Sequence, residues 1–420
     1  MKFCYYILGL CLSALTATIL APTTCLAQGY DEYLLARELN DEGFEDIKLA
    51  ICGDTMVAMF EDRAHRGTFR GAATAIRQTA QRHDGMRHFV LVLTEYRMPQ
   101  LCVRASKREG TWDVSVDRDM KDPIQRLRTT DALFPSTGRL DITVHPMVSL
   151  VNNKLDHFFD WAVRIAPAFA MTLWPGSRLT VQPIFPIAHN LPDDDHKRFI
   201  QPGCVNLQQQ FVINKRWQVN AAIGTFFPER WGLQARATFY PTRNLALYVD
   251  GGVTGTVCYS KLEHFRFYKL SRINAMAGLN YYEPRTKLQM QLAGGRFLYG
   301  DYGLRADITR HFCEYTVGVY AIYTGGETNG GFHFSVPVGG KRQKRNGPVR
   351  LRLPEYFGME YSANSWFKYY LERMGQTYTT QPDATRSDHF WQPAFIEEYV
   401  RRTLNEGFDL SKAEKATFKP

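Results

Sequence analysis

The stretch Trp217-Gln-Val-Asn-Ala-Ala-Ile-Gly-Thr-Phe-Phe227 decides the fold of this chain. Its odd positions, from Trp217 to Thr225, are mostly apolar, and its even positions, from Gln218 to Gly224, are polar or small. Successive side chains of a strand point to opposite faces of a sheet. The stretch is therefore predicted to be a β-strand with one apolar and one polar face.

The same alternation recurs between residues 161 and 363. Clear repeats span residues 233–240, 245–259, 273–282, 288–298 and 302–308, and weaker ones span 162–173, 178–187, 205–214, 315–323, 331–338 and 354–363. Short turns rich in Pro, Gly, Asn and Arg separate them. About twelve such strands predict an antiparallel up-and-down meander.

Two architectures can bury such a meander. A soluble β-sandwich or barrel turns the apolar face inward, whereas a transmembrane barrel turns it outward to lipid. Strands of roughly 9–11 residues, polar faces with Arg, Asp and Gln, and aromatic residues near strand ends, such as Tyr281-Tyr282, are typical of the membrane form. These features favour a transmembrane β-barrel, with the soluble sandwich as the alternative.

The composition agrees with a wall that is apolar on one face only. The 420 residues carry a net charge of +9, and the mean hydropathy is −0.32 in spite of 27 Phe, 22 Tyr and 7 Trp. So many aromatic residues exclude a disordered chain. A helical membrane bundle is excluded because only one apolar run, at the very start, approaches spanning length.

Residues 1–27 are predicted to be a secretory signal peptide. Lys2 precedes an apolar run from Phe3 to Ala21, and small residues stand at positions −3 and −1 of a cut after Ala27. An uncleaved membrane anchor is the alternative. Export together with a barrel pattern predicts the outer membrane of a Gram-negative cell.

The fold class predicted for the whole chain is α+β. A small periplasmic α/β domain spans residues 28–120, with the order helix, strand, strand, helix, strand, strand and its second helix over Thr68–Arg82. A connector (121–160), the barrel (161–363) and a helical periplasmic tail (364–420) follow. In the tail, Ser365–Gly375 and Pro393–Gly407 are predicted helices.

The tail echoes the beginning of the chain. Each of the two segments is a short predicted helix closed by Gly-Phe, at Gly43-Phe44 and at Gly407-Phe408. One interpretation is chance, because this pattern is common at helix ends. The other is that the tail begins a second, truncated copy of the N-terminal domain.

Three stretches carry a resemblance to a known family: Leu39 with Glu42-Gly-Phe-Glu-Asp-Ile-Lys-Leu49, Met56-Val-Ala-Met-Phe-Glu-Asp-Arg-Ala-His-Arg66, and Gly294-Gly-Arg-Phe-Leu-Tyr-Gly-Asp-Tyr-Gly303. Through them, most of residues 35–360 resembles the YjbH-like exopolysaccharide outer-membrane proteins. Asp62 stands where the family has Asn, and His65 where it has an aromatic residue. The resemblance implies a short, single-barrel member with a periplasmic α/β domain, tied to exopolysaccharide or capsule production, and it brings no catalytic residues.

Two groups of residues are candidates for binding. Polar-face residues of the barrel would line or plug the lumen and could contact a sugar or pair with each other: Arg236, Asp250, Arg296 and Arg305. The densest positive run would form a basic loop at the barrel rim: Lys341, Arg342, Lys344 and Arg345. Its charge would attract acidic polysaccharide or lipid phosphates, or it is a plain solvated turn.

The chain shows no pattern that predicts catalysis or a cofactor. It lacks a Gly-x-Ser-x-Gly element and a phosphate loop, and its histidines are scattered. The acidic run Asp193-Asp194-Asp195-His196 could suggest a cation site, but a solvated loop is favoured. Five cysteines follow the signal peptide without metal-ligand spacing; Cys52 and Cys102 could pair, although free thiols are the favoured interpretation.

Three functions remain in competition at this level. The first is a non-enzymatic factor for exopolysaccharide or capsule production or export, and the second is a porin-like channel for small solutes. The third is an outer-membrane hydrolase of lipid or glycan. The expected partners are outer-membrane lipids, acidic polysaccharide and periplasmic export proteins, and no nucleic acid is expected.

Overall fold

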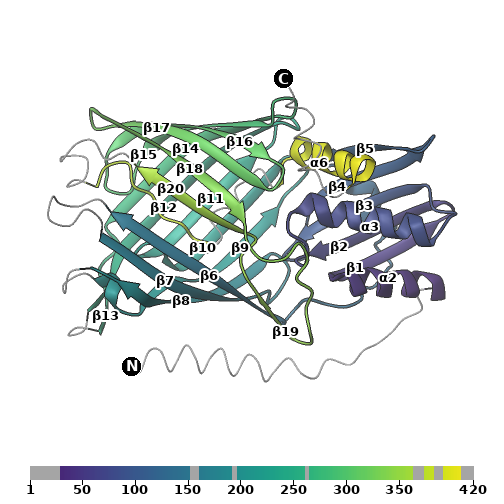
Figure 1. Cartoon of the computed structure of the whole chain (residues 1–420), viewed down its shortest axis with the longest axis horizontal. Coiled ribbons are helices and arrows are strands. Elements are labelled where there is room, and N and C mark those ends of the chain that lie inside the picture. The colour runs from purple at the N-terminus through teal and green to yellow at the C-terminus, as the bar shows by residue number, and fades with distance from the viewer. Residues whose placement is uncertain are drawn as a thin grey trace.

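The computed structural model describes residues 29–151, 160–191, 196–260, 264–362, 373–382 and 391–407. These residues form a five-stranded sheet and a fifteen-stranded sheet, with the α-helices gathered on the smaller one (Figure 1). The predicted signal peptide lies outside the described residues, and so does the predicted helix Ser365–Gly375 except for its last three residues.

The smaller sheet forms the N-terminal α/β domain. Its elements are α2 (Tyr30–Glu42), β1 (Phe44–Cys52), β2 (Thr55–Asp62), α3 (Thr68–Arg82), β3 (His88–Glu95), β4 (Met98–Arg108), β5 (Thr111–Asp117) and α4 (Lys121–Arg126). The predicted order of two helices and four strands is confirmed, and β5 adds a fifth strand. Strands β2 and β3 pair in parallel because α3 crosses over between them.

The tail helix α6 (Pro393–Glu406) completes this domain (Figure 1). It packs against α3 and β5, and its apolar stripe is buried in the same core as the sheet: Phe395, Ile396, Val400 and Leu404. Residues 393–406 therefore fold into one domain with residues 30–126. Phe408, the last residue of the Gly-Phe echo, lies outside the described residues.

The larger sheet is an up-and-down meander, as predicted. Its elements are β6 (Leu140–Val151), β7 (Asp160–Met171), β8 (Ser177–His189), β9 (Gln201–Val212), β10 (Trp217–Phe226), β11 (Arg230–Phe239), β12 (Leu245–Ser260), β13 (His264–Phe267), β14 (Arg272–Glu283), β15 (Leu288–Arg296), β16 (Tyr302–Phe312), β17 (Tyr315–Thr324), β18 (Glu327–Pro337), β19 (Val349–Arg352) and β20 (Tyr356–Ser362), with the short helix η1 (His196–Arg198) before β9. Neighbours from β6 to β18 are antiparallel, and β13 pairs only with β12.

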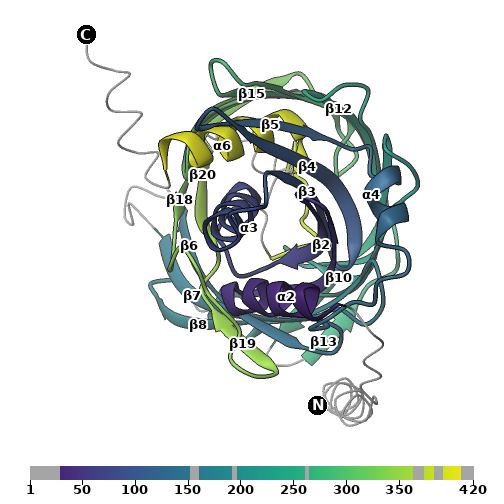
Figure 2. The same cartoon turned by 90° about the vertical axis from the view of Figure 1, so that its right-hand side faces the viewer.

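The two edges of this sheet are consecutive in the chain. Strand β19 pairs in parallel with β6 at one edge, β20 pairs with β18 at the other, and residues 353–355 connect them. The sheet curls into a ring when viewed end-on (Figure 2). No pairing joins β19 to β20 among the described residues, so a chain link brings the edges together.

Burial in this sheet is inverted relative to a soluble protein. On the outer face, Val249 and Val319 are 55% and 57% exposed, whereas Thr254 and Asn280 on the inner face are fully buried. The apolar face thus points outward along the alternating strands, and the polar face points into the ring. A soluble sandwich would bury the apolar face instead.

The sheet differs from the sequence prediction in extent. Strand β6 lies in the segment predicted to be a connector, and the sheet has fifteen strands where about twelve were predicted. Pro146 lies within β6, and a proline inside an alternating run counts against a strand in sequence-based prediction, whereas β13 and β19 are only four residues long, too short to show a period. In the described part of the chain, no helix is long and apolar enough to cross a membrane.

The two ends of the ring differ. At the end that faces the α/β domain, here called the domain end, connections from β7 to β17 are two to five residues long. At the opposite end, here called the far end, connections reach eleven residues, between β8 and β9. The α/β domain lies across the domain end and covers it (Figure 2).

Candidate functional site

A buried carboxylate joins the α/β domain to the ring. Asp141, on the first strand of the large sheet, accepts hydrogen bonds from three guanidinium groups: Arg63 at 3.0 Å, Arg345 at 2.7 Å and Arg350 at 2.9 and 3.0 Å. All four side chains are at most 10% exposed. Three buried positive charges on one carboxylate require further anions nearby.

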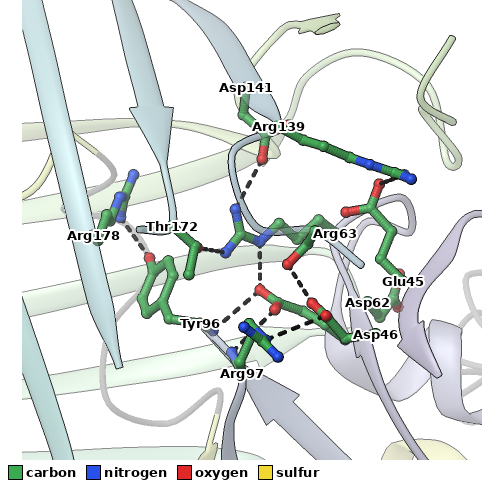
Figure 3. A network of polar contacts seen from close by, with 12 residues as sticks. Glu45, Asp46, Asp62, Arg63, Tyr96, Arg97, Arg139, Asp141, Thr172 and Arg178 are labelled. Atoms are coloured by element: carbon green, nitrogen blue, oxygen red, sulfur yellow. Dashed lines mark hydrogen bonds and ion pairs between the residues drawn. The ribbon is translucent and has the colours of Figure 1, made fainter. Parts of the chain in front are cut away.

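The α/β domain supplies those anions (Figure 3). Glu61 pairs with Arg63 at 2.5 Å, and Glu45 pairs with Arg345 at 2.6 Å. Burial raises the pKa of Glu61, and Arg63 opposes that rise. Burial alone would lower the pKa of Arg63, but Glu61 and Asp141 outweigh it and hold the value well above the ordinary one. The network is therefore a charge-balanced joint between the two sheets.

The predicted basic rim loop belongs to this joint. Arg342 pairs with Glu42, Lys344 lies 3.5 Å from Asp41, and Arg345 pairs with Glu45 and Asp141. The carbonyl oxygen of Lys341 accepts a hydrogen bond from the backbone N–H of Arg66. Three of the four side chains of the predicted basic loop thus pair with carboxylates at the end of α2 and the start of β1, which reduces the charge that the loop offers to acidic polysaccharide or lipid phosphate.

Helix α6 forms a second attachment at the domain end. The Tyr399 hydroxyl accepts a hydrogen bond from the backbone N–H of Cys313, and Phe395 packs edge-on against Tyr282 at 5.3 Å. Glu397 forms an ion pair with Arg243 in the turn between β11 and β12. The tail thus binds both the α/β domain and the turns of the ring.

The lumen candidates separate into two sets. Arg236, Asp250 and Arg305 alternate with exposed apolar residues and face the lumen. The guanidinium carbon of Arg236 lies 3.8 Å from the centre of the Tyr248 ring, and Arg305 pairs with Glu360 at 2.8 Å. The prediction that Arg296 faces the lumen is wrong. Arg296 pairs in register with Ala275 and with the exposed Tyr302, and therefore lies on the outer face.

A returning segment of the chain occupies the lumen. Residues 373–382 follow β20 at the far end and lead back toward α6 at the domain end (Figure 1). Tyr378 stacks on Phe226 at 5.3 Å and donates a hydrogen bond to Asn274, and the carbonyl oxygen of Thr380 accepts hydrogen bonds from Asn206 and Gln208. Residues 373–382, here called the lumen segment, therefore bind polar residues of the inner wall along its length.

Cavities lined by inner-face residues lie beside the lumen segment and nearer the domain end. One, of about 220 Å³, is lined by Asp250, Arg305 and Tyr378 among others, so two of the predicted lumen residues share it. The other, of about 310 Å³, lies toward the domain end between β15, β16, β18 and Phe395 of α6. Both are small compared with a continuous channel, since the segment and the α/β domain fill the remainder.

The larger cavity contains the nearest approach to a catalytic arrangement in the described residues. Thr309 Oγ1 lies 3.5 Å from Nε2 of His333, but Asp307 contacts that same nitrogen at 3.0 Å. A base-activating carboxylate must bind the other ring nitrogen, so this geometry does not form a triad.

Cysteines and metal ligands add no chemistry in the described part of the chain. The five cysteines there form no disulfide with one another, the exposed Cys52 and the buried Cys102 included, and burial raises the pKa of the Cys102 thiol to about 12. No group of three or more His, Cys, Asp or Glu residues there has the arrangement of a metal site. Asp193, Asp194 and Asp195 lie outside the described residues.

Sequence reasoning missed the residues that organise the interior. Asp141 and Arg350 lie in segments without a motif, and a pairing between residues 209 positions apart leaves no local signal. Arg63 lies in the stretch Met56–Arg66, which sequence reasoning singled out without assigning a role to this residue. Tyr378 lies outside every regular element, so no periodicity could indicate it.

Comparisons with known proteins return little similarity. No protein-family model and no curated protein matches the chain. Among solved structures, it is similar to the crystal structure of Pseudomonas aeruginosa OccK2 (OpdF), with 10% identity and a TM-score of 0.24. The alignment covers 53% of this chain and 63% of OccK2, less than two thirds of that protein. The fold description therefore rests on the strand pairing given above.

Proposed function

We propose that this chain is an outer-membrane β-barrel that holds an α/β domain at its periplasmic end and assists the production or export of an exopolysaccharide without catalysis of its own. The observation that carries the membrane assignment is the inverted burial of the large sheet. An outward apolar face is stable next to lipid and costly in water. Aromatic pairs at both ends of the outer face, Trp217 with Phe239 and Trp231 with Phe267, support the same assignment.

The orientation follows from the connections. Outer-membrane barrels have short periplasmic turns and longer extracellular loops. At the domain end the five hairpin connections between β7 and β17 are two to five residues long and, among the described residues, only 338–348 form a longer one. Residues 152–159 and 190–200 make longer connections at the far end. We therefore place the α/β domain and α6 in the periplasm and the far end outside the cell.

The occupied lumen favours a scaffold over an open pore. The lumen segment binds the inner wall, and the α/β domain covers the periplasmic mouth. Both are tied to the ring by the Asp141 network and by α6. A barrel whose lumen is filled in this way holds its periplasmic domain firmly. A factor that binds periplasmic export proteins requires such a fixed domain.

The polysaccharide assignment is supported by the resemblance to the YjbH-like family. The resembling stretch from Met56 to Arg66 contains Glu61 and Arg63, and Arg66 forms a further ion pair to the ring, with Glu314 at 2.9 Å. In this protein the family-like residues thus form the joint between domain and barrel. In an export factor of the proposed kind, this joint would hold the periplasmic domain on the barrel.

Deletion of the gene tests the proposal. Surface polysaccharide, measured under conditions that induce its synthesis, should fall in the deletion strain and return on complementation. The protein should fractionate with the outer membrane and migrate faster on gels when it is not boiled. Unchanged polysaccharide in the deletion strain would disprove the role proposed here.

A porin-like channel is the second candidate. It is favoured by the polar, buried inner wall, on which Thr254, Asn280 and Gln289 are 0–2% exposed. Conductance of the purified full-length protein in a planar bilayer discriminates between the two. A steady open current favours the channel, and a silent barrel favours the scaffold.

A further inference from the structure

We infer that the far mouth of the ring carries a binding site for the anionic groups of an acidic surface glycan. The site consists of Arg230, Arg272 and Arg373 around the side chain of Tyr299. It deepens the proposed function, on which it rests, by naming the chemical class of the polysaccharide. It also lies at the end opposite to the basic loop at residues 341–345.

Three separate segments bring the arginines together. Arg230 begins β11, Arg272 begins β14, and Arg373 begins the lumen segment. Their guanidinium carbons lie 6.0, 5.4 and 5.6 Å from the centre of the Tyr299 ring. Three positive groups around one ring repel one another, so the arrangement favours an anion between them.

The register places two of these arginines on the lumen side. Thr254, a fully buried inner-face residue of β12, is the cross-strand partner of Arg272. The same threonine accepts hydrogen bonds from Arg230, which is 3% exposed. The two guanidinium groups thus flank one inner-face position, away from the outer face that would contact lipid.

The described partners of Arg230 and Arg272 leave the charges of these two side chains uncompensated. Among the described residues, Arg230 donates to the hydroxyls of Thr254 and Thr256, and Arg272 donates to the carbonyl oxygen of Tyr299. These acceptors are neutral. By contrast, every arginine of the Asp141 network has a carboxylate partner.

The position selects a soluble glycan over a lipid headgroup. Guanidinium groups bind carboxylate and phosphate alike, often with two parallel hydrogen bonds. Lipid phosphates lie at the outer perimeter of a barrel, whereas this cluster faces its mouth. A chain that carries carboxylates or phosphates and approaches from outside the cell fits this position.

The test uses the purified full-length protein in detergent. Labelled oligogalacturonate serves as the acidic probe and a malto-oligosaccharide as the neutral one. Arg272→Gln and Arg230→Gln remove charge from the site, and Arg216→Gln removes the same charge from an exposed turn at the domain end. Arg272 is exposed, so its variant folds even if the Arg230 variant does not.

We expect the acidic probe alone to bind, and the Arg272→Gln variant to bind at least about tenfold more weakly than wild type or Arg216→Gln. Binding should weaken as salt rises. Equal affinity in the two variants, no binding, tighter binding of lipopolysaccharide, or displacement by equimolar inorganic phosphate would overturn the inference. If deletion of the gene lowers surface polysaccharide but the purified protein does not bind the acidic probe, the site is rejected and the proposed function stands. If the protein binds the acidic probe but deletion leaves surface polysaccharide unchanged, the proposed function is rejected and the site stands.

Discussion

Arg63 of the α/β domain donates a hydrogen bond of 3.0 Å to Asp141, on the first strand of the large sheet. The pair is buried, and Arg345 and Arg350 share the same carboxylate. The joint depends on this one carboxylate, because its removal leaves three buried positive charges without compensation.

The first prediction follows from that geometry. Asp141→Asn should destabilise the joint by about 3–5 kcal/mol, the usual cost of breaking a buried ion pair. Limited proteolysis should then cleave the α/β domain from a ring that still resists protease. The control is Asp119→Asn, which removes an exposed pair with Lys215 and should not change the cleavage rate. Equal resistance of both variants would show that the network does not hold the domain.

A close approach within the α/β domain gives the second prediction. A Cβ atom on Gly71 of α3 would lie 1.6 Å from the carboxylate of Asp62, which caps the turn after β2 through the backbone N–H groups of Ala64 and His65. Gly71→Ala should therefore cost about 1–3 kcal/mol, in spite of the better helix propensity of Ala. The matched control is Gly85→Ala, where no atom lies within 4 Å. Chemical denaturation monitored on the α/β domain compares the two, and an unchanged Gly71 variant contradicts the packing described.

The tail helix gives the third prediction. Phe395 is buried among Tyr282, His311 and Tyr399. Phe395→Ala should cost about 3–5 kcal/mol and expose the tail to protease, because it leaves a cavity between α6 and the ring. Arg401→Ala, on the exposed side of the same helix, should have no such effect. If both variants are cleaved at the same rate as wild type, α6 is not a firm attachment.

The fourth prediction concerns pH. Burial raises the pKa of Glu398, which lies on the packed side of α6, although Arg402 opposes this at 3.4 Å. A carboxyl group with a raised folded-state pKa contributes most below its ordinary value of 4.5, and that contribution is lost as pH rises through the folded-state value. Protease resistance of the tail should therefore decline as pH rises above 4.5, and Glu398→Gln should flatten this part of the profile. A variant with the same pH profile as wild type would exclude Glu398 as the cause.

Much of the fold could be predicted because strand alternation is a local property. The stretch from Trp217 to Phe226 shows its period within ten residues, and the structure pairs it with both neighbours as predicted. The site could not be predicted in the same way. Asp141 binds arginines 78, 204 and 209 positions away, and such pairings have no local period. The partners of the basic loop at 341–345 could not be predicted for the same reason, since the acidic residues that pair with it lie near the start of the chain.

The last prediction tests whether the lumen segment blocks the ring. Tyr378 stacks on Phe226 and hydrogen-bonds Asn274, so it fixes the segment against two strands of the inner wall. Tyr378→Ala removes both contacts and should release the segment, which would raise single-channel conductance from a closed baseline in a planar bilayer. Tyr302→Ala is the control, because it removes an aromatic ring from the outer face, where Tyr302 is exposed. If the Tyr378 variant shows as little conductance as the control, the lumen segment does not block the ring and the α/β domain alone closes it. Asp141→Asn, which loosens that domain, is then the variant that should conduct.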